Sequence, residues 1–288
     1  MKSKVVVFVG ICLLTLGVVS YLNWRYEVIA VHPLRSDGQH ELKVMTWNVH
    51  CSRGADSLRQ RDIASLIIKK NADVVLLNEF NQDSCKVADS LLRMRYHHIV
   101  EHRSHKKCGD IFYSKYEIYN SGRIISPVKG KPILGIKTTI AVGKDSVLIL
   151  GVHLMSNQSY KSNLGKEKGS GNNNNLSFAN YKEGQGLRCF QAECTKNEIL
   201  KSRHSVIVMG DMNDFNQSQP LEILTSSGLR DSWWEGGFGY GATYHEGWLR
   251  LRIDHIYYND RLKLESVKVV ETKLSDHNPL VAGFSLKR

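Results

Sequence analysis

Short apolar runs that each end in a cluster of polar residues recur along most of this chain, and they constrain its fold more than any other feature. The run at residues 74–77 contains only apolar side chains, as expected of a strand buried on both faces of a sheet. Seven further segments have strand character, at residues 43–48, 111–113, 135–142, 147–152, 206–209, 253–258 and 280–284. Covered sheets joined by connections of unequal length predict an α/β fold with two packed sheets.

The segments between these strands include helices and one long polar stretch. Apolar residues recur at near-helical spacing from Leu58 to Ile67, after a candidate N-cap at Asp56 or Ser57. Residues 185–203 also predict a helix, and residues 221–224 begin a shorter one. Residues 156–186, rich in Asn, Ser, Gly and Lys, lack strong periodicity, which is typical of a functional loop or of disorder. Because this segment follows His153 directly, we expect a loop that faces the substrate.

The first 23 residues differ from the rest of the chain. Lys2 and Lys4 precede an uncharged run at residues 5–22, which as a helix would be about 27 Å long, enough to cross a bilayer. A cleaved secretory signal has the same features, but no small-x-small cleavage site lies between Thr15 and Trp24, which favours a retained anchor. We therefore expect an anchor or signal at residues 1–23, a tether at 24–41 and one folded domain at 42–288. With the lysines on the cytoplasmic side, that domain faces the periplasm or the exterior, and it is secreted if the segment is cleaved.

The composition is that of a globular protein with a basic surface. With 42% hydrophobic and 23% charged residues, the chain is neither wholly disordered nor a multi-span membrane protein. The net charge of +11 favours polyanionic partners, either nucleic acid or anionic headgroups, although the basic residues are scattered along the sequence. The sequence contains no Cys-x-x-Cys pair that would indicate a zinc site. Cys189 with Cys194, or Cys85 with Cys108, could pair in an oxidising compartment, but their spacing does not show it, and we expect the cysteines to be structural or incidental.

Polar clusters follow or begin the predicted strands at six places, at residues 46–48, 78–80, 151–153, 210–214, 252–255 and 275–279. If these strands are neighbours, their carboxylate, amide and imidazole groups meet at one rim. Oxygen ligands of this kind suit a hard cation such as Mg²⁺, and the absence of thiolates argues against structural zinc. A single Asp-x-Asn is more typical of a turn, so the prediction of a site rests on all six clusters and their order.

In this order the clusters resemble the endonuclease/exonuclease/phosphatase superfamily, which includes pancreatic deoxyribonuclease, abasic-site endonucleases, secreted sphingomyelinases and inositol polyphosphate 5-phosphatases. The resemblance extends from about Leu42 to Leu286. It implies a four-layered α/β sandwich, in which two mixed sheets pack face to face and the active site lies at one rim. A short single anchor before such a domain resembles bacterial surface or periplasmic members.

The resemblance also implies a metal site. Asn48 matches the Asn of the first strand, and Glu79 matches the metal-binding Glu, which in the family normally follows Gln where this chain has Asn78. Asp276, in the terminal Ser-Asp-His motif, is expected near the metal. The implied cofactor is Mg²⁺, and Mn²⁺ or Ca²⁺ would also fit.

The catalytic roles follow from the same motifs. Asp211 and Asn213 match a Gly-Asp-x-Asn motif that orients the attacking water and the phosphate. His277 matches the acid–base group, and Asp254 the Asp that holds it in one tautomer. Asp211 is an alternative base. His153 resembles the His that hydrogen-bonds phosphate oxygens in deoxyribonuclease-like members.

Three parts of the sequence bear on substrate contacts. Asp110 precedes a strand where deoxyribonuclease-like members carry an acidic partner for the phosphate-binding His, which predicts an Asp110–His153 pair. Residues 108–115 retain only the end of the family pattern there. Residues 237–248 resemble a Gly/aromatic stretch of bacterial members, and Tyr244 within it is a candidate substrate contact, although packing in a loop or core is the alternative.

The expected activity is that of a membrane-anchored, Mg²⁺-dependent phosphoesterase, foremost a nuclease acting on DNA or RNA. Lipid headgroups or phosphorylated inositols and sugars are the alternative substrates, although the sequence contains no clear exposed apolar hairpin of the kind that membrane-attacking sphingomyelinases use. A non-catalytic scaffold is a third reading, against which the presence of Glu79 and His277 argues. The expected partners are nucleic acid and, through the N-terminal segment, a membrane. We expect a monomer.

Overall fold

The central strands of this protein are buried on both faces, and this burial determines its layers. The computed structural model describes residues 15–23, 28–32, 41–50, 56–103, 109–127, 133–157 and 178–287. Successive side chains of a strand point to opposite faces. In β3 (Val74–Phe80), Val74 and Leu76 belong to one hydrophobic core, whereas Val75 and Leu77 belong to another. The apolar run is therefore a strand with a core on each side, as predicted.

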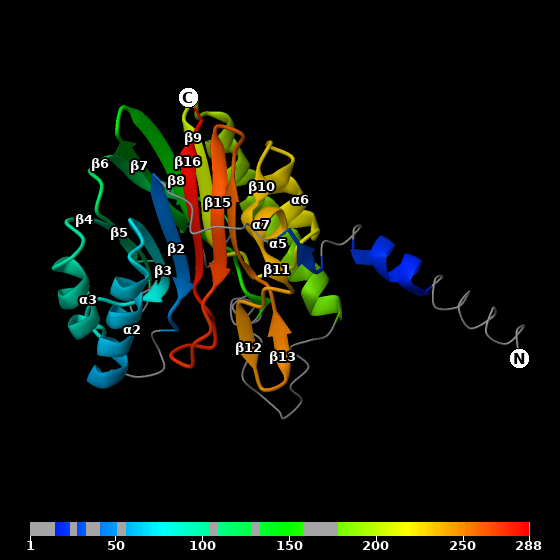
Figure 1. Ribbon diagram of the computed structural model, residues 1–288, viewed down its shortest axis with the longest axis horizontal. Helices are drawn as coiled ribbons and strands as arrows, with labels where there is room; N and C mark the ends of the chain where they lie inside the picture. Colours follow the sequence, from blue (N-terminus) through cyan, green and yellow to red (C-terminus); the bar gives the residue numbers. More distant parts are fainter. Residues whose placement is uncertain are drawn as a thin grey trace, which may run out of the picture.

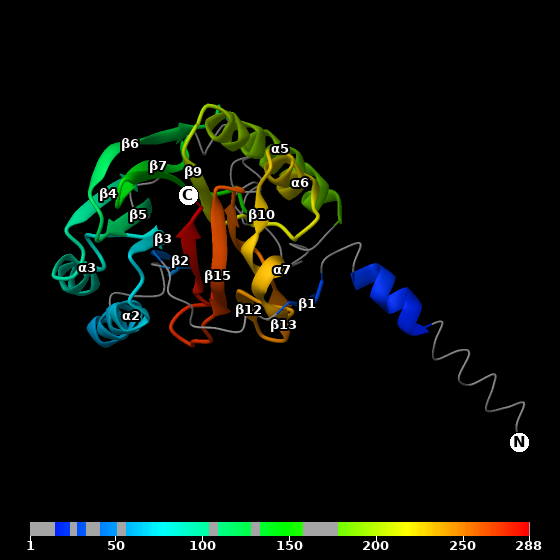
Figure 2. The same cartoon turned by 45° about the horizontal axis from the view of Figure 1, so that its top comes forward.

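Two six-stranded mixed sheets lie face to face (Figures 1 and 2). The first sheet has the order β15 (Leu262–Val269), β16 (Leu280–Leu286), β2 (Leu42–Asn48), β3, β5 (Gly109–Ser114) and β4 (His98–Arg103). The second has the order β10 (Arg230–Asp231), β14 (Asp254–Tyr258), β9 (Ser205–Asp211), β8 (Asp145–His153), β7 (Ile133–Val142) and β6 (Ile118–Ile125). The pairs β2–β3 and β8–β9 are parallel.

Helices cover the outer face of each sheet, which completes a four-layered α/β sandwich and confirms the predicted fold (Figure 2). The helices α2 (Ser57–Lys70) and α3 (Lys86–Arg93) pack on the first sheet, and α5 (Phe178–Leu200) and α6 (Gln219–Thr225) on the second. The Asp56 side chain accepts a hydrogen bond from Leu58 N and caps α2, while Leu58 itself is 69% exposed and lies outside the core. Sequence spacing therefore located the helix but assigned one apolar residue to the wrong face.

Smaller elements lie at one end of the second sheet. The helix α7 (Ser232–Gly236) precedes β11 (Phe238–Gly239), which pairs with β1 (Ala30–Val31). The strands β12 (Tyr244–Glu246) and β13 (Leu249–Leu251) form a hairpin. Part of the segment predicted as a tether is thus paired with the folded domain.

Most of the predicted anchor at residues 1–23 lies outside the described residues. Its described part, residues 15–23, is helical. Within the described part of the chain, no helix combines the length and apolar character needed to cross a membrane. Cys189 and Cys194 are both free, so this candidate disulfide is not formed. Cys85, the N-cap residue of α3, is also free and is buried in the core, whereas Cys108 lies outside the described residues.

Candidate active site

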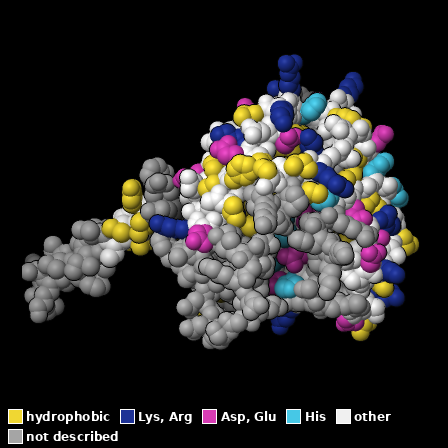
Figure 3. All heavy atoms as spheres, turned by 180° about the vertical axis from the view of Figure 1, so that it is seen from behind, with side chains coloured by type: hydrophobic (Ala, Val, Ile, Leu, Met, Phe, Trp, Pro, Cys, Tyr) yellow, Lys and Arg dark blue, Asp and Glu magenta, His cyan; other side chains and the backbone are white. Residues whose placement is uncertain are grey.

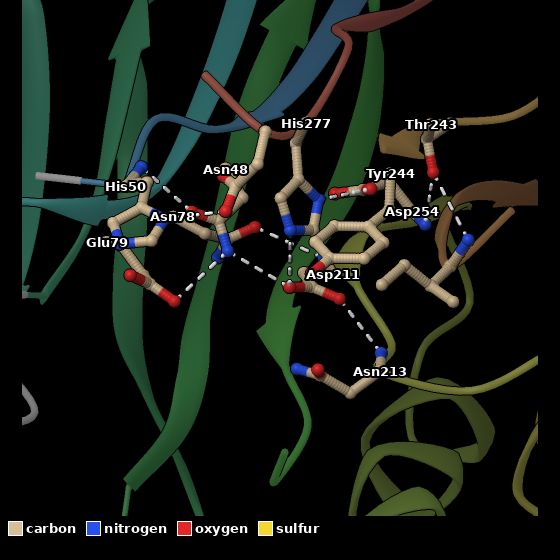
Figure 4. Close-up of polar contacts among 12 residues, drawn as sticks. Asn48, His50, Asn78, Glu79, Asp211, Asn213, Thr243, Tyr244, Asp254 and His277 are labelled. Atoms are coloured by element: carbon tan, nitrogen blue, oxygen red, sulfur yellow. Dashed lines mark hydrogen bonds and ion pairs between the residues drawn. The ribbon is translucent and has the colours of Figure 1, made fainter. Parts of the chain in front are cut away.

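The polar clusters of the sequence converge because the strands that carry them are neighbours. Asp211 at the end of β9 is in register with His153 at the end of β8 and with Asp254 at the start of β14. In the other sheet, Asn48 at the end of β2 is in register with Asn78 in β3. Both groups lie at the same rim, where Figure 4 shows side chains from both sheets pointing toward one another. Seen from behind, the molecule has a hollow in which Asp, Glu and His side chains are visible (Figure 3).

The imidazole of His277 is held by a buried carboxylate. Its Nδ1 lies 2.7 Å from Asp254 Oδ2, and Asp254 is fully buried. Trp47 Nε1 donates to the His277 carbonyl at 2.8 Å, and the Tyr244 ring lies edge-on at 5.0 Å between centroids. Nε2, the other ring nitrogen, lies 3.9 Å from Asp211 Oδ2. Because Nδ1 is engaged by Asp254, Nε2 is the nitrogen available for proton transfer.

Burial and mutual charge perturb this cluster. Burial raises the pKa of Asp211, and the nearby charge of Asp254 raises it further, to about 7. Burial alone would lower the pKa of His277, but the charges of Asp254 and Asp211 outweigh it and raise that pKa to about 10. Burial and the charges of neighbouring groups therefore govern proton exchange at Asp211 and His277, and perturbed groups of this kind are typical of acid–base sites.

The turn after β9 fixes Asn213. Its backbone N–H donates to Asp211 Oδ1 at 2.9 Å, and its Nδ2 donates to the Leu154 carbonyl at 3.0 Å. The residue has φ of 50°, in the left-handed region, which Asn tolerates better than most residues. The side chain therefore bridges the ends of β9 and β8.

Glu79 enters the site at an irregularity in β3. The β3–β5 register shifts between Leu77 and Phe80, and Glu79 has φ of 52°. Bulges of this kind re-aim a side chain. The Glu79 side chain is 34% exposed, and its Oε1 accepts a hydrogen bond from Asn48 Nδ2 at 3.2 Å.

Asn78, which replaces the usual Gln, joins the two sheets. Its Nδ2 donates to Asp110 Oδ1 at 2.7 Å, and its Oδ1 accepts from Asp211 N at 3.2 Å. His153 Nδ1 lies 3.8 Å from the same Asp110 oxygen, and its Nε2 lies 4.0 Å from Glu79 Oε1. The structure thus brings the predicted Asp110–His153 pair within ion-pair range, beyond hydrogen-bond distance.

The sequence interpretation missed His50. Its Nδ1 lies 2.8 Å from Asp276 Oδ2, and its backbone N–H donates to Asn48 Oδ1 at 3.0 Å. Ser275 Oγ donates to the other Asp276 oxygen at 3.2 Å. The signal in the sequence is its position two residues beyond Asn48, just after the end of β2.

Tyr244 lies at the edge of the site. It forms an isolated bridge with His277, and its hydroxyl donates to Glu246 Oε2 at 2.6 Å. Thr243 Oγ1, one residue earlier, accepts from the backbone N–H of Asp254 at 2.9 Å. This strand therefore supports the Asp254–His277 pair and presents Tyr244 beside it.

The three predicted metal ligands, Glu79, Asn48 and Asp276, carry the oxygen atoms that a hard divalent cation prefers. Hydrogen bonds link Glu79 to Asn48, Asn48 to His50, and His50 to Asp276, so the three predicted ligands lie on one chain of contacts. In the Asn48 amide, Nδ2 donates to the Glu79 carboxylate, and Oδ1 accepts from the His50 backbone N–H.

A second group of ligand atoms, from Asp211, Asp254 and His277, lies within 4.8 Å of one another. Asp254 Oδ1 is buried and has no hydrogen-bond partner among the described residues. The carboxylate oxygens of this group suit Mg²⁺ or a similar hard cation.

Comparisons with known proteins agree with this fold. The model of a family described as the Endonuclease/Exonuclease/phosphatase family matches residues 45–277. A truncated TDP2 from Caenorhabditis elegans is similar in structure, with a TM-score of 0.63 and 18% identity, over 85% of this chain and 97% of that one. A variant of the 3' phosphatase NExo from Neisseria, bound to product DNA hairpin, has a TM-score of 0.63 and 20% identity, over 85% and 99%. TDP2 from D. rerio, complexed with single strand DNA product, has 0.64 and 17%, over 85% and 98%. No curated protein sequence registers as a match.

Proposed function

This chain belongs to the endonuclease/exonuclease/phosphatase family, and on that premise we propose that it is a metal-dependent nuclease that hydrolyses phosphodiester bonds of DNA or RNA. The family makes it a phosphoester hydrolase. The observation that carries the catalytic part is the buried Asp254–His277 pair, whose free Nε2 faces Asp211. The net charge of +11 supports a polyanionic substrate, as do the nucleic-acid products in the structures of its neighbours.

Glu79, Asp276 and Asn48 would hold the cation, with Mg²⁺ favoured by their hard oxygen atoms and Mn²⁺ or Ca²⁺ compatible with them. The cation would supply neutralisation of the negative charge that develops on the phosphoryl oxygens. His50 holds Asp276 at 2.8 Å and keeps that carboxylate directed toward the rim.

The protein groups around the phosphate would divide the remaining work. His277 Nε2 exchanges a proton with the water or the leaving oxygen, while Asp254 keeps Nδ1 protonated. Asp211 is the alternative base, because the raised pKa brings its carboxyl into the range where it can accept a proton. His153 and Asn213 donate hydrogen bonds to nonbridging oxygens and orient the phosphate.

Lipid headgroups are the second candidate substrate, and one feature favours them. The β12–β13 hairpin beside the site carries Trp248 in its turn, and this side chain is 89% exposed. An exposed Trp on a hairpin suits the interface of a bilayer. With an N-terminal anchor, the domain would act at the membrane, facing the periplasm or the exterior.

The test compares wild-type full-length protein with Glu79→Gln and with Glu222→Gln, an exposed control on α6. Each is assayed on plasmid DNA, RNA, sphingomyelin vesicles and bis-p-nitrophenyl phosphate, with Mg²⁺ or with EDTA. We expect Mg²⁺-dependent cleavage of nucleic acid that Glu79→Gln lowers at least a hundredfold and Glu222→Gln leaves unchanged. Hydrolysis of sphingomyelin without cleavage of nucleic acid would refute the nuclease proposal and support lipid headgroups as the substrate. Silence on every substrate would refute it.

A further inference from the structure

Arg188 on α5 forms an ion pair in the interior of the protein. Its side chain and that of Asp214 are both 0% exposed, and Arg188 Nε lies 2.7 Å from Asp214 Oδ2. Burying such a pair has a desolvation penalty that can exceed the Coulombic gain, so a buried pair is weak evidence of a stabilising role. The structure around it indicates what else the pair does.

The same guanidinium holds the chain that follows β8. Arg188 Nη1 donates to the Met155 carbonyl at 3.2 Å and to Asn157 Oδ1 at 2.8 Å. One turn later on α5, Gln191 Oε1 accepts from Met155 N at 2.8 Å. Both backbone polar groups of Met155 are therefore fixed by α5.

The partner carboxylate is held on its other oxygen as well. Tyr181, also on α5, donates from its hydroxyl to Asp214 Oδ1 at 2.7 Å. The Phe215 N–H donates to the same oxygen at 2.9 Å. The position of Asp214 is thus set from α5 through two side chains.

Two site residues lie directly beside these anchored positions. Asn213 precedes Asp214, and His153 lies two residues before Met155. Between them, Asn213 Nδ2 donates to the Leu154 carbonyl at 3.0 Å. Arg188 therefore joins the two segments that carry Asn213 and His153, without reaching the site itself.

We infer that Arg188 is a positioning residue, which fixes the Asn213 turn against the segment after His153 so that both side chains meet the same phosphate. This inference rests on the proposed function. Asn213 has φ of 50°, and such a conformation persists only where the surroundings hold it. Loss of the fork-shaped guanidinium lets the two segments move apart, and small displacements of positioning groups reduce rate strongly.

The decisive variant is Arg188→Lys, which keeps the charge but cannot make all three contacts. Per folded molecule, we expect kcat on bis-p-nitrophenyl phosphate to fall about 10- to 100-fold, with KM changed less than about threefold. Glu198→Gln is the matched control, because it removes the ion pair from α5 to Lys137, 2.6 Å long. It should leave kcat unchanged.

A double-mutant cycle with Asn213→Ala separates positioning from general loosening. We expect Arg188→Lys to lose most of its effect on kcat in the Asn213→Ala background. An equal loss in both backgrounds, or an unchanged kcat in Arg188→Lys, would overturn the inference. If Arg188→Lys does not fold, Tyr181→Phe replaces it in the same cycle, with an expected loss of about three- to tenfold.

One readout does not need catalysis. Hydrogen exchange at the Asn213 amide, which donates to Asp211 Oδ1, should accelerate at least tenfold in Arg188→Lys and stay unchanged in Glu198→Gln. Unchanged exchange refutes the positioning role. If wild-type protein hydrolyses no phosphoester but this exchange effect is present, the proposed function fails while the anchoring of Asn213 stands.

Discussion

Replacing Asp254 with Asn should abolish most turnover while leaving the fold intact. The carboxylate lies 2.7 Å from His277 Nδ1, and a hydrogen bond to a charged group of this kind contributes about 1.5–3 kcal/mol. An Asn amide can donate to Nδ1, which favours the tautomer with its proton on Nε2 and removes the base. Together these effects predict a fall in kcat of about 10²- to 10⁴-fold, or about 2.7–5.4 kcal/mol in the barrier.

The same substitution should lower stability moderately. The Asp254 charge raises the pKa of the buried His277, so the pair stabilises the folded state at neutral pH, although Asp254 Oδ1 has no hydrogen-bond partner among the described residues. We expect the free energy of unfolding in urea to fall by about 1.5–3 kcal/mol, which leaves the protein folded. Asp260→Asn, an exposed position after β14, is the control. A kcat within twofold of wild type, or a loss that equals the unfolded fraction, would contradict the assigned role.

Three predictions concern stability. Burial lowers the pKa of His102 from 6.5 to about 4. The unfolded chain therefore binds the proton more tightly, and stability falls as pH decreases from 6.5 to 4. Between pH 7 and pH 4.5, urea titrations should show that the free energy of unfolding falls by about 2 kcal/mol more in wild type than in His102→Gln. Asp231→Ala leaves the buried Arg252 guanidinium without the carboxylate 2.6 Å away, and should lower the free energy of unfolding by about 3–5 kcal/mol. Gly210→Ala would place a Cβ against the backbone oxygen of Val152 at φ of 141° and should lower the free energy of unfolding by at least about 2 kcal/mol. Gly186→Ala on α5 meets no neighbouring atom and should raise the melting temperature. Equal effects of the two variants would refute the packing argument.

The strands that the sequence predicted are the interior ones. All eight predicted strands lie inside the two sheets, whereas the missed strands β15, β4, β10 and β6 are the four edges. An interior strand is covered on both faces and reads as an apolar run. The edge strand β6 contains Asn120, Ser121 and Gly122 and is largely exposed, so no apolar run marks it. Edge strands form because a neighbour offers a ladder of hydrogen bonds, which local sequence does not encode.

The site was predictable to the extent that it lies at strand ends. Strand-end position and motif order placed Asn48, Asp211 and His277 at one rim, because parallel neighbours end together and the antiparallel strand β16 begins where β2 ends. The Asp276–His50 contact and the Arg188–Asp214 pair join residues far apart in sequence, and neither residue type nor spacing links them. Such partners emerge only when loops and helices close over the strands.

Residues with irregular backbone conformations at strand ends direct several side chains into the site. Five described non-glycine residues have positive φ, and three of them, His50, Glu79 and Asn213, supply groups to the rim. A straight strand directs alternate side chains into the two cores, so a side chain that must face the cleft between the sheets needs a bulge or a left-handed residue at the strand end. Each such conformation has an energetic cost that the surrounding contacts must offset, here the Asn48 bonds to Glu79 and to His50 N–H and the Asp211 bond to Asn213 N–H. The site therefore depends on its supporting hydrogen bonds as much as on its chemical groups, which is why variants of the supporting residues should lower turnover before they unfold the protein.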